Sequence, residues 1–296
     1  MGEGWRTKDE GRGTKDEGRR KKDEGTKDEG WRTKDEGMRD WRRVPVVALV
    51  DNIIPHEKRM GDRAFSRYFV GAVDRFVVMS RSVEAEMRLF TQTKPVQYVP
   101  HPIYDIYGEG VGRADALAQL GLSADKRYLL FFGFIRAYKG LDLALEAIAR
   151  CLLPTVYLIV AGEFYEDEAP YRNLIKELGI EERVIIRSDF IPTDEVRFYF
   201  GAADLILQPY KSATQSGVAQ IAYHFEKPMI VTDVGGLPEI VANGEAGYVV
   251  KPDPEAIAEA IVDFYKHDRA EGFIGRVREK KKEFLWSNMV EALKFS

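Results

Sequence analysis

The feature that most constrains the fold is an alternation that begins after Arg43, where short β-branched runs take turns with amphipathic stretches. This alternation is typical of βα units, in which buried parallel strands are joined by helices. One helix is expected over Leu141–Leu152, which carries leucine and isoleucine at spacings of three or four, and another from Pro254, since proline suits a first helical turn. The sequence therefore predicts an α/β fold with a parallel sheet. The expected strands are Val44–Val50, Arg75–Met79, Tyr128–Phe134, Thr155–Ala161, Arg183–Arg187, Leu205–Gln208, Met229–Thr232 and Gly247–Val250.

The first 43 residues have a different texture. The octapeptide GWRTKDEG at residues 4–11 returns unchanged at residues 30–37, with TKDEG and KKDEG units between the two copies. Each unit holds a glycine and none holds an aliphatic residue, so no apolar face is available to offset the entropy of ordering. We expect this segment to be disordered. A protein-interaction array and an incidental translated repeat remain as alternatives.

Composition excludes several classes of protein. With 45% hydrophobic residues and a formal charge of −4, the chain is neither collagen-like nor wholly disordered, and it lacks the basic balance of a nucleic-acid-binding protein. Its one cysteine, Cys151, and a beginning that is charged from Glu3 onward favour a reducing, cytoplasmic compartment. The apolar runs fall short of the roughly 18 to 20 residues that cross a bilayer, which leaves only peripheral membrane contact open.

The segment FFGFIRAYKGLD, residues 131–142, carries the clearest chemical signal. An apolar strand runs into Gly133, then into a loop with Arg136 and Lys139, and then into a helix. Free backbone N–H groups, the helix dipole and two cations all favour a phosphate group there. A nucleoside diphosphate is the natural ligand, and a solvated basic loop is the alternative.

A second loop of this kind lies downstream in ATQSGVAQ, where Gln215, Ser216 and Gly217 precede an expected helix. Ligands bind beyond the carboxyl ends of strands in open α/β sheets, so both loops are expected to face one crevice. The turn GGLPE, residues 235–239, follows the next strand. Its glycines and Pro238 serve either a purely conformational role or a ligand.

The ordered motifs FGFIRAYKGLDLALEA, YLIVAGE, RVIIRSDFIP, ADLILQPY, KPMIVTDVGGLPEIV and NGEAGYVVKPDPEAIAEAI resemble the donor-binding domain of family 4 retaining glycosyltransferases, which have the GT-B fold. The resemblance covers about residues 128–265. It implies two Rossmann-like domains around a nucleotide sugar, and transfer of the sugar with retention to a glycan or lipid-linked acceptor, as in polysaccharide biosynthesis. No required metal and no further cofactor are implied, and the base of the donor stays open.

Residues carried over by position follow from this resemblance. Lys139 matches the lysine that contacts the donor diphosphate, while the arginine expected after Gly133 is replaced by Phe134, so that Arg136 is the nearest guanidinium. The two glutamates of the family fall on Ala213 and Ile221, whose side chains cannot accept a hydrogen bond, which leaves Gln215 or Gln220 as the substitute. Catalytic roles are expected for Arg136 and Lys139, which would stabilise the leaving diphosphate, and for His56 on the acceptor side. Donor contacts are expected for Gly133, Arg136, Lys139, Phe190, Gln215, Ser216, Gly217 and Val218.

The sequence divides the chain into four segments that differ in length and in expected structure. Residues 1–43 form the repeat, 44–107 an incomplete acceptor-side Rossmann-like domain, 108–275 the donor domain, and 276–296 a C-terminal helix with its amphipathic pattern over Lys280–Phe295. No metal site is indicated, because His224 and His267 lack partners at ligand spacing. The leading hypothesis is a glycosyltransferase. An inactive nucleotide-binding remnant is the main alternative, and a GT-B sugar-nucleotide epimerase is a third.

Overall fold

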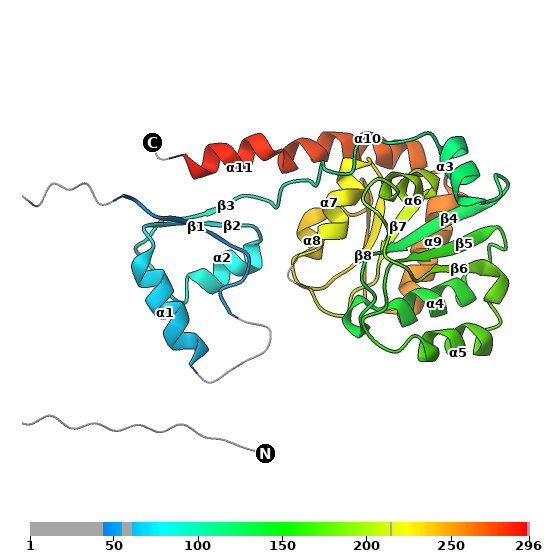
Figure 1. Ribbon diagram of the computed structural model, residues 1–296, viewed down its shortest axis with the longest axis horizontal. Helices are drawn as coiled ribbons and strands as arrows, with labels where there is room; N and C mark the ends of the chain where they lie inside the picture. The colour runs from blue at the N-terminus through cyan, green and yellow to red at the C-terminus, as the bar shows by residue number, and fades with distance from the viewer. Residues whose placement is uncertain (1–43, 55–60, 214, 295–296) are drawn as a thin grey trace, which may run out of the picture. The chain divides into compact units, whose positions relative to one another are not determined.

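The computed structural model describes residues 44–54, 61–213 and 215–294 (Figure 1). The described residues from Pro45 onward belong to one compact unit. The disorder predicted for residues 1–43 and the role predicted for His56 therefore fall outside the described residues.

The larger sheet has six parallel strands in the order β6-β5-β4-β7-β8-β9. Their bounds are β4 Arg127–Phe132, β5 Val156–Ala161, β6 Val184–Arg187, β7 Leu205–Gln208, β8 Met229–Thr232 and β9 Gly247–Val250. The chain starts in the middle with β4, moves outward to β6, and returns to β7 on the other side of β4. This order places a topological switch point between β4 and β7.

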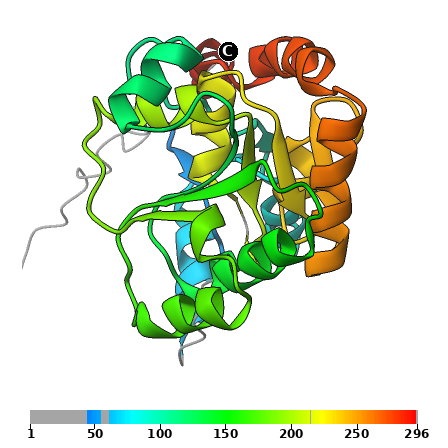
Figure 2. The ribbon, with the colours of Figure 1, turned by 90° about the vertical axis from the view of Figure 1, so that its right-hand side faces the viewer.

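Helices cover both faces of this sheet (Figures 1 and 2). Successive strand residues point to opposite faces, so Leu129 packs in one core cluster and Leu130 in the other. The cluster of Leu129 is completed by α4 Leu141–Arg150, α5 Ala169–Glu177 and α9 Pro254–Lys266. The cluster of Leu130 is completed by α3 Arg113–Leu120, α6 Val196–Ala202, α7 Gly217–His224, α8 Leu237–Ile240 and α10 Ala270–Lys281.

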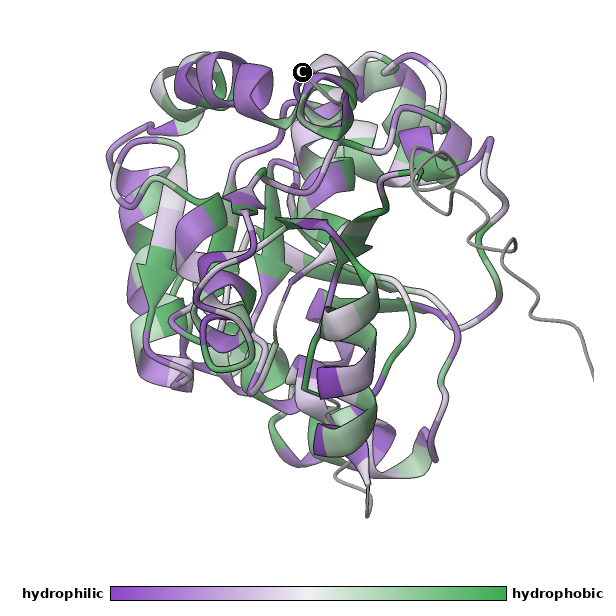
Figure 3. Cartoon of the chain, turned by 90° about the vertical axis from the view of Figure 1, so that its left-hand side faces the viewer, coloured by the Kyte–Doolittle hydropathy of each residue, from purple (hydrophilic) through white to green (hydrophobic). Residues whose placement is uncertain are grey.

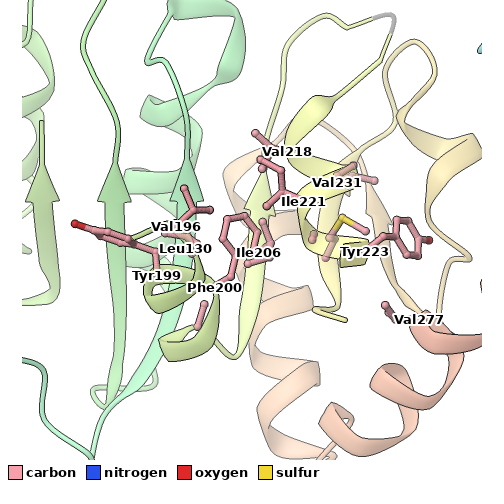
Figure 4. Close-up of a cluster of buried hydrophobic side chains, with 14 of the residues drawn as sticks. Leu130, Val196, Tyr199, Phe200, Ile206, Val218, Ile221, Tyr223, Val231 and Val277 are labelled. Atoms are coloured by element: carbon pink, nitrogen blue, oxygen red, sulfur yellow. The ribbon is translucent and has the colours of Figure 1, made fainter. Parts of the chain in front are cut away.

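The second of these clusters fixes α7, the helix that borders the site described below. Figure 4 shows Val218, Ile221 and Tyr223 of α7 reaching into the cluster around β7. The hydroxyl of Tyr223 donates to the carbonyl of Ile240 at 2.5 Å, which ties α7 to α8. In Figure 3 the strands are mostly green, whereas the helices alternate green and purple, as expected for helices that bury one face.

The smaller sheet has three parallel strands in the order β1-β2-β3, with bounds β1 Val47–Val50, β2 Arg75–Val78 and β3 Val96–Tyr98. The helices α1 Asp62–Ala72 and α2 Arg81–Met87 cover one face, where Phe76, Val78 and Met87 are buried. Val77 and Val99 pack instead with Met289 and Ala292 of α11, Trp286–Leu293. This three-stranded sheet lies within residues 44–107, for which an incomplete Rossmann-like domain is predicted.

The predicted strands from Leu205, Met229 and Gly247 are confirmed with their bounds, whereas β3 was not predicted. The prediction of one continuous helix over Lys280–Phe295 is wrong, because the chain forms two helices there with a break between them. α10 ends at Lys281, a 3₁₀ turn spans Lys282–Phe284, and Leu285 is extended at φ −72° and ψ 144° before α11 begins. Two further 3₁₀ turns span Ala137–Lys139 and Glu181–Arg183. No helix in the described part of the chain is both long and apolar enough to cross a membrane.

Candidate functional site

A cavity of about 400 Å³ opens where β4, β5 and β7 end. Gly133 follows β4 directly, Gly162 follows β5 directly, and Tyr210 lies two residues beyond β7; all three line the cavity. The carboxyl ends of strands at a switch point are where open α/β sheets bind ligands. The volume also lies within the range of small-molecule sites. We call this cavity the switch-point pocket.

Two glycines of the pocket, Gly133 and Gly162, allow the backbone segments after β4 and β5 to approach each other closely. Gly133 has φ +91°, and a Cβ atom there would lie 3.3 Å from Nζ of Lys139. Gly162 has φ +142°, and a Cβ atom there would lie only 2.4 Å from the carbonyl oxygen of Gly133. A side chain is therefore excluded at Gly162 by conformation and by space, whereas at Gly133 it would be strained by conformation and would crowd the Lys139 ammonium. The absence of both side chains lets the Lys139 ammonium reach the end of β4.

Lys139 ends the 3₁₀ turn Ala137–Lys139, and its side chain is only 8% exposed. Burial, and secondarily the charge of Arg136, lowers the pKa of Lys139 to about 8. Its Nζ lies 5.8 Å from the ring centroid of Tyr210. Among the described residues, no carboxylate contributes to the pKa of this ammonium. A buried cation without a protein counter-charge is suited to binding an anion.

The N-terminus of α7 forms the facing wall through Ser216, Gly217 and Val218. The Ser216 hydroxyl caps the helix, accepting from the backbone N–H of Ala219 at 3.3 Å. The same hydroxyl donates to the side-chain oxygen of Gln208 and lies 3.3 Å from the hydroxyl of Tyr210. The first N–H groups of a helix have no partner within it and carry the positive end of its dipole. Both predicted loops thus present anion-binding groups to one pocket.

Phe190 and Gln215 also line the pocket. Phe190 follows the edge strand β6, and Gln215 follows β7, which lies on the other side of β4. Phe190 stands in the loop after β6 and is 63% exposed, whereas Gln215 comes directly before the cap of α7 and is half-buried. The donor-binding roles expected for them and for the other residues of the pocket stay predictions.

Arg136 is placed differently from Lys139. Its side chain is exposed, its guanidinium lies 4.8 Å above the ring centroid of Tyr165, and it does not line the pocket. Phe134, which occupies the position where the resembling family has its arginine, packs edge-to-face on Tyr165 with a centroid distance of 4.5 Å. The cation expected beside the diphosphate is therefore stacked on an aromatic ring at the side of the pocket.

Ten of the residues that line the pocket were not predicted, among them Gly162, Glu163 and Tyr210. Gly162 had a signal in the sequence, because a glycine follows an apolar strand there as it does at Gly133. Glu163 and Tyr210 have no such signal, since they reach the pocket only through the strand order. Across the described residues, no three or more His, Cys, Asp and Glu side chains gather closely enough to hold a metal ion.

The chain has relatives of known name. Residues 113–282 match the family model of glycosyl transferases group 1. The D-inositol 3-phosphate glycosyltransferase of Mycolicibacterium vanbaalenii is 31% identical over 243 residues, which are 76% of this chain and 52% of that protein. The enzyme of the same name from Mycobacterium marinum is 31% identical over 76% of this chain and 50% of its own length. The chain thus spans about half the length of these curated relatives.

Solved structures share the fold. Sucrose-phosphate synthase from Thermosynechococcus elongatus superposes with a TM-score of 0.71 at 22% identity, over 83% of this chain and 65% of that one. The Anabaena protein HepE, solved in complex with UDP, superposes with a TM-score of 0.72 at 18% identity, over 84% of this chain and 71% of that one. Both are similar to the α/β arrangement of this chain.

Proposed function

The chain belongs to the family of glycosyl transferases group 1, and from this we propose that it is a glycosyltransferase whose switch-point pocket binds a nucleotide sugar. The sugar is transferred to a glycan or lipid-linked acceptor with retention of configuration. The relatives are named as glycosyltransferases, which supports transfer of a sugar, and HepE has been solved with UDP and with UDP-glucose.

The observation that carries the proposal is the buried ammonium of Lys139. Cleavage of the bond between a sugar and a nucleoside diphosphate develops negative charge on the leaving phosphate. A fixed cation in a pocket shielded from water stabilises such charge more than a cation in bulk solvent does. Lys139 is the buried cation of the pocket wall, and the N-terminus of α7 faces the same space.

We also propose an orientation for the donor, which the strand order supports. The phosphates lie at Lys139 beyond β4, in the middle of the sheet, where the lysine and the helix N-terminus converge. Phe190, beyond the edge strand β6, offers an aromatic face to the nucleotide base. The sugar then extends toward the side of β7 and Gln215.

Nucleotide binding is tested by thermal unfolding with UDP, GDP and ADP. A ligand at a hundred times its Kd stabilises the folded state by about 2.7 kcal/mol, which raises Tm by about 5 to 10 °C. We expect one nucleotide to give such a shift with the wild type and with Lys176→Met, a control at an exposed lysine on α5. Lys139→Met is expected to lose it. A shift that survives in Lys139→Met contradicts the placement of the diphosphate.

Turnover separates a glycosyltransferase from the alternative of a nucleotide-binding module without activity. Both give the nucleotide shift, but only an enzyme releases nucleoside diphosphate from a nucleotide sugar, by hydrolysis or by transfer. We expect release with the sugar conjugate of the nucleotide that binds, and loss of release in Lys139→Met. Binding without turnover across a broad panel of acceptors supports the module, and conversion of a UDP-sugar without an acceptor supports an epimerase.

A further inference from the structure

The 3₁₀ turn Ala137–Lys139, which carries the lysine of the switch-point pocket, has no cap of its own. Its N-cap residue, Arg136, makes no side-chain hydrogen bond to the turn. The first N–H groups of a helical turn have no partner inside the turn and need one from elsewhere. The N–H of Ala137 donates to Oε2 of Glu166 at 2.9 Å, across 29 positions of the chain. A carboxylate from a distant loop therefore caps the turn.

Glu166 belongs to the loop after β5, which lies against the loop that carries Lys139. The N–H of Ile135 donates to the carbonyl of Glu163 at 2.8 Å, and the N–H of Tyr165 donates to the carbonyl of Ile135 at 3.1 Å. These two bonds fix the backbone shortly after β4 ends. The side chain of Glu166 extends the contact between the two loops to the turn that ends at Lys139.

The other carboxylate oxygen of Glu166 is held by α5. The hydroxyl of Tyr171 donates to Oε1 of Glu166. Burial, and secondarily the hydrogen bond to Glu166, raises the pKa of Tyr171, so the phenol keeps its proton and donates it. The ring of Tyr171 is 8% exposed and packs in the core cluster of Leu129, which fixes the hydroxyl. Contacts thus run without a gap from the core, through Glu166, to the turn.

The position of the turn decides the environment of Lys139. Ala137, where the cap binds, lies two positions before the lysine, and the lysine side chain reaches back to Gly133 at the end of β4. A turn that loses its cap frays, and a buried ammonium gains water when the backbone that carries it moves. We infer that Glu166 is a positioning residue, which holds the turn and with it the Lys139 ammonium in place for the phosphate groups of the donor. This inference rests on the proposed function for the ligand.

NMR of the lysine side chains measures the environment of Lys139 without a ligand. The resonance of Lys139 is the one that Lys139→Met removes. In Glu166→Leu we expect the pKa of Lys139 to rise from about 8 toward its ordinary value of 10.5, because the ammonium gains water. Glu166→Gln keeps an acceptor for Ala137 and a partner for Tyr171 but has no charge. We expect the pKa of Lys139 to stay at about 8 in this variant.

The direction of the change separates loss of the cap from loss of charge. Removing a carboxylate takes away a negative charge, which by itself lowers the pKa of a neighbouring ammonium. The other charged or titratable groups beside Lys139 are Arg136, Glu163 and Tyr210, and all three are present in every variant. A pKa of Lys139 that stays at about 8 in Glu166→Leu, or that rises as much in Glu166→Gln, overturns the inference.

Titration calorimetry with UDP, GDP and ADP connects the position of the lysine to binding. We expect the affinity for the nucleotide that binds to fall about fivefold in Glu166→Leu, the effect of one ordinary hydrogen bond, and less than about twofold in Glu166→Gln. Glu177→Leu, at an exposed glutamate that ends α5, is the matched control and is expected to bind like the wild type. Unchanged affinity in Glu166→Leu, or an equal loss in Glu177→Leu, overturns the inference.

Two further outcomes keep the test decisive. If Glu166→Leu does not fold, Tyr171→Phe releases the other oxygen of the carboxylate at nearly constant volume. We expect a smaller rise in the pKa of Lys139 in that variant, and no rise overturns the inference. If the wild type binds none of the three nucleotides, the proposed function fails, while the NMR titration still decides whether Glu166 positions the lysine.

Discussion

Replacing Lys139 by methionine is expected to stabilise the unliganded protein while it removes nucleotide binding. The lysine is 8% exposed, and burial lowers its pKa from 10.5 to about 8. A difference of about 2.5 pKa units corresponds to about 3 kcal/mol of free energy that the folded state forgoes to keep the ammonium charged at pH 7. Methionine fills a similar volume without a charge, so Lys139→Met is expected to regain a large part of this free energy.

The pH dependence has a definite sign. Below pH 8 the folded and unfolded chains both hold the proton on Lys139, and the full cost is present. Between pH 8 and 10.5 the unfolded chain keeps a proton that the folded chain has released, so the stability of the wild type rises with pH. From pH 7 to pH 9.5 this rise amounts to about 2 kcal/mol, and Lys139→Met lacks it.

Urea unfolding at pH 7.0 and pH 9.5 measures both effects. The wild type, Lys139→Met and the surface control Lys176→Met are compared at each pH, which cancels titrations common to all three proteins. We expect Lys139→Met to be the most stable of the three at pH 7 and the control to follow the wild type. A Lys139→Met protein that is less stable than the wild type at pH 7, or that gains as much stability on going to pH 9.5, refutes the reasoning.

Other substitutions probe the rest of the pocket. Gly133→Ala forces a side chain into φ +91° beside the ammonium; we expect a loss of about 1 to 2 kcal/mol in urea unfolding and weaker nucleotide binding by calorimetry. Ser216→Ala removes the cap of α7 and the partner of Gln208, with an expected cost of about 1 to 2 kcal/mol in the same unfolding assay. Phe190→Ala removes a side chain that is 63% exposed, so we expect unchanged unfolding and about fivefold weaker nucleotide binding by calorimetry. Arg136→Ala removes a charge that lowers the pKa of Lys139 and is expected to move the pH-dependent rise in stability to higher pH.

The sheet could be predicted from the sequence where strands are buried on both faces. LILQ of β7 and MIVT of β8 are fully buried, and such apolar runs stand out against their polar flanks. β3, with the sequence VQY, is too short and too mixed to give that signal. The break near Leu285 was not predictable from periodicity, because the apolar positions continue through it without glycine or proline.

The residues of the candidate site also fall into a group that local sequence predicts and a group that it does not. Gly133 and Lys139 come from one continuous strand and loop, and Ser216 to Val218 come from one helix start, so local sequence suffices to group each set. Tyr210 and Glu163 join them only because β7 and β5 both neighbour β4. The position of Arg136 depends on Tyr165, which belongs to the loop after another strand. Contacts of that kind are set by tertiary structure and leave no mark on local spacing.

The most direct test of the central claim is a crystal structure of the chain with the nucleoside diphosphate that raises its Tm. We predict a phosphate oxygen about 2.7 to 2.9 Å from Nζ of Lys139, as in other charge-assisted hydrogen bonds, and the base beside Phe190. A nucleotide bound outside the switch-point pocket, or one whose phosphates do not reach Lys139, contradicts the account.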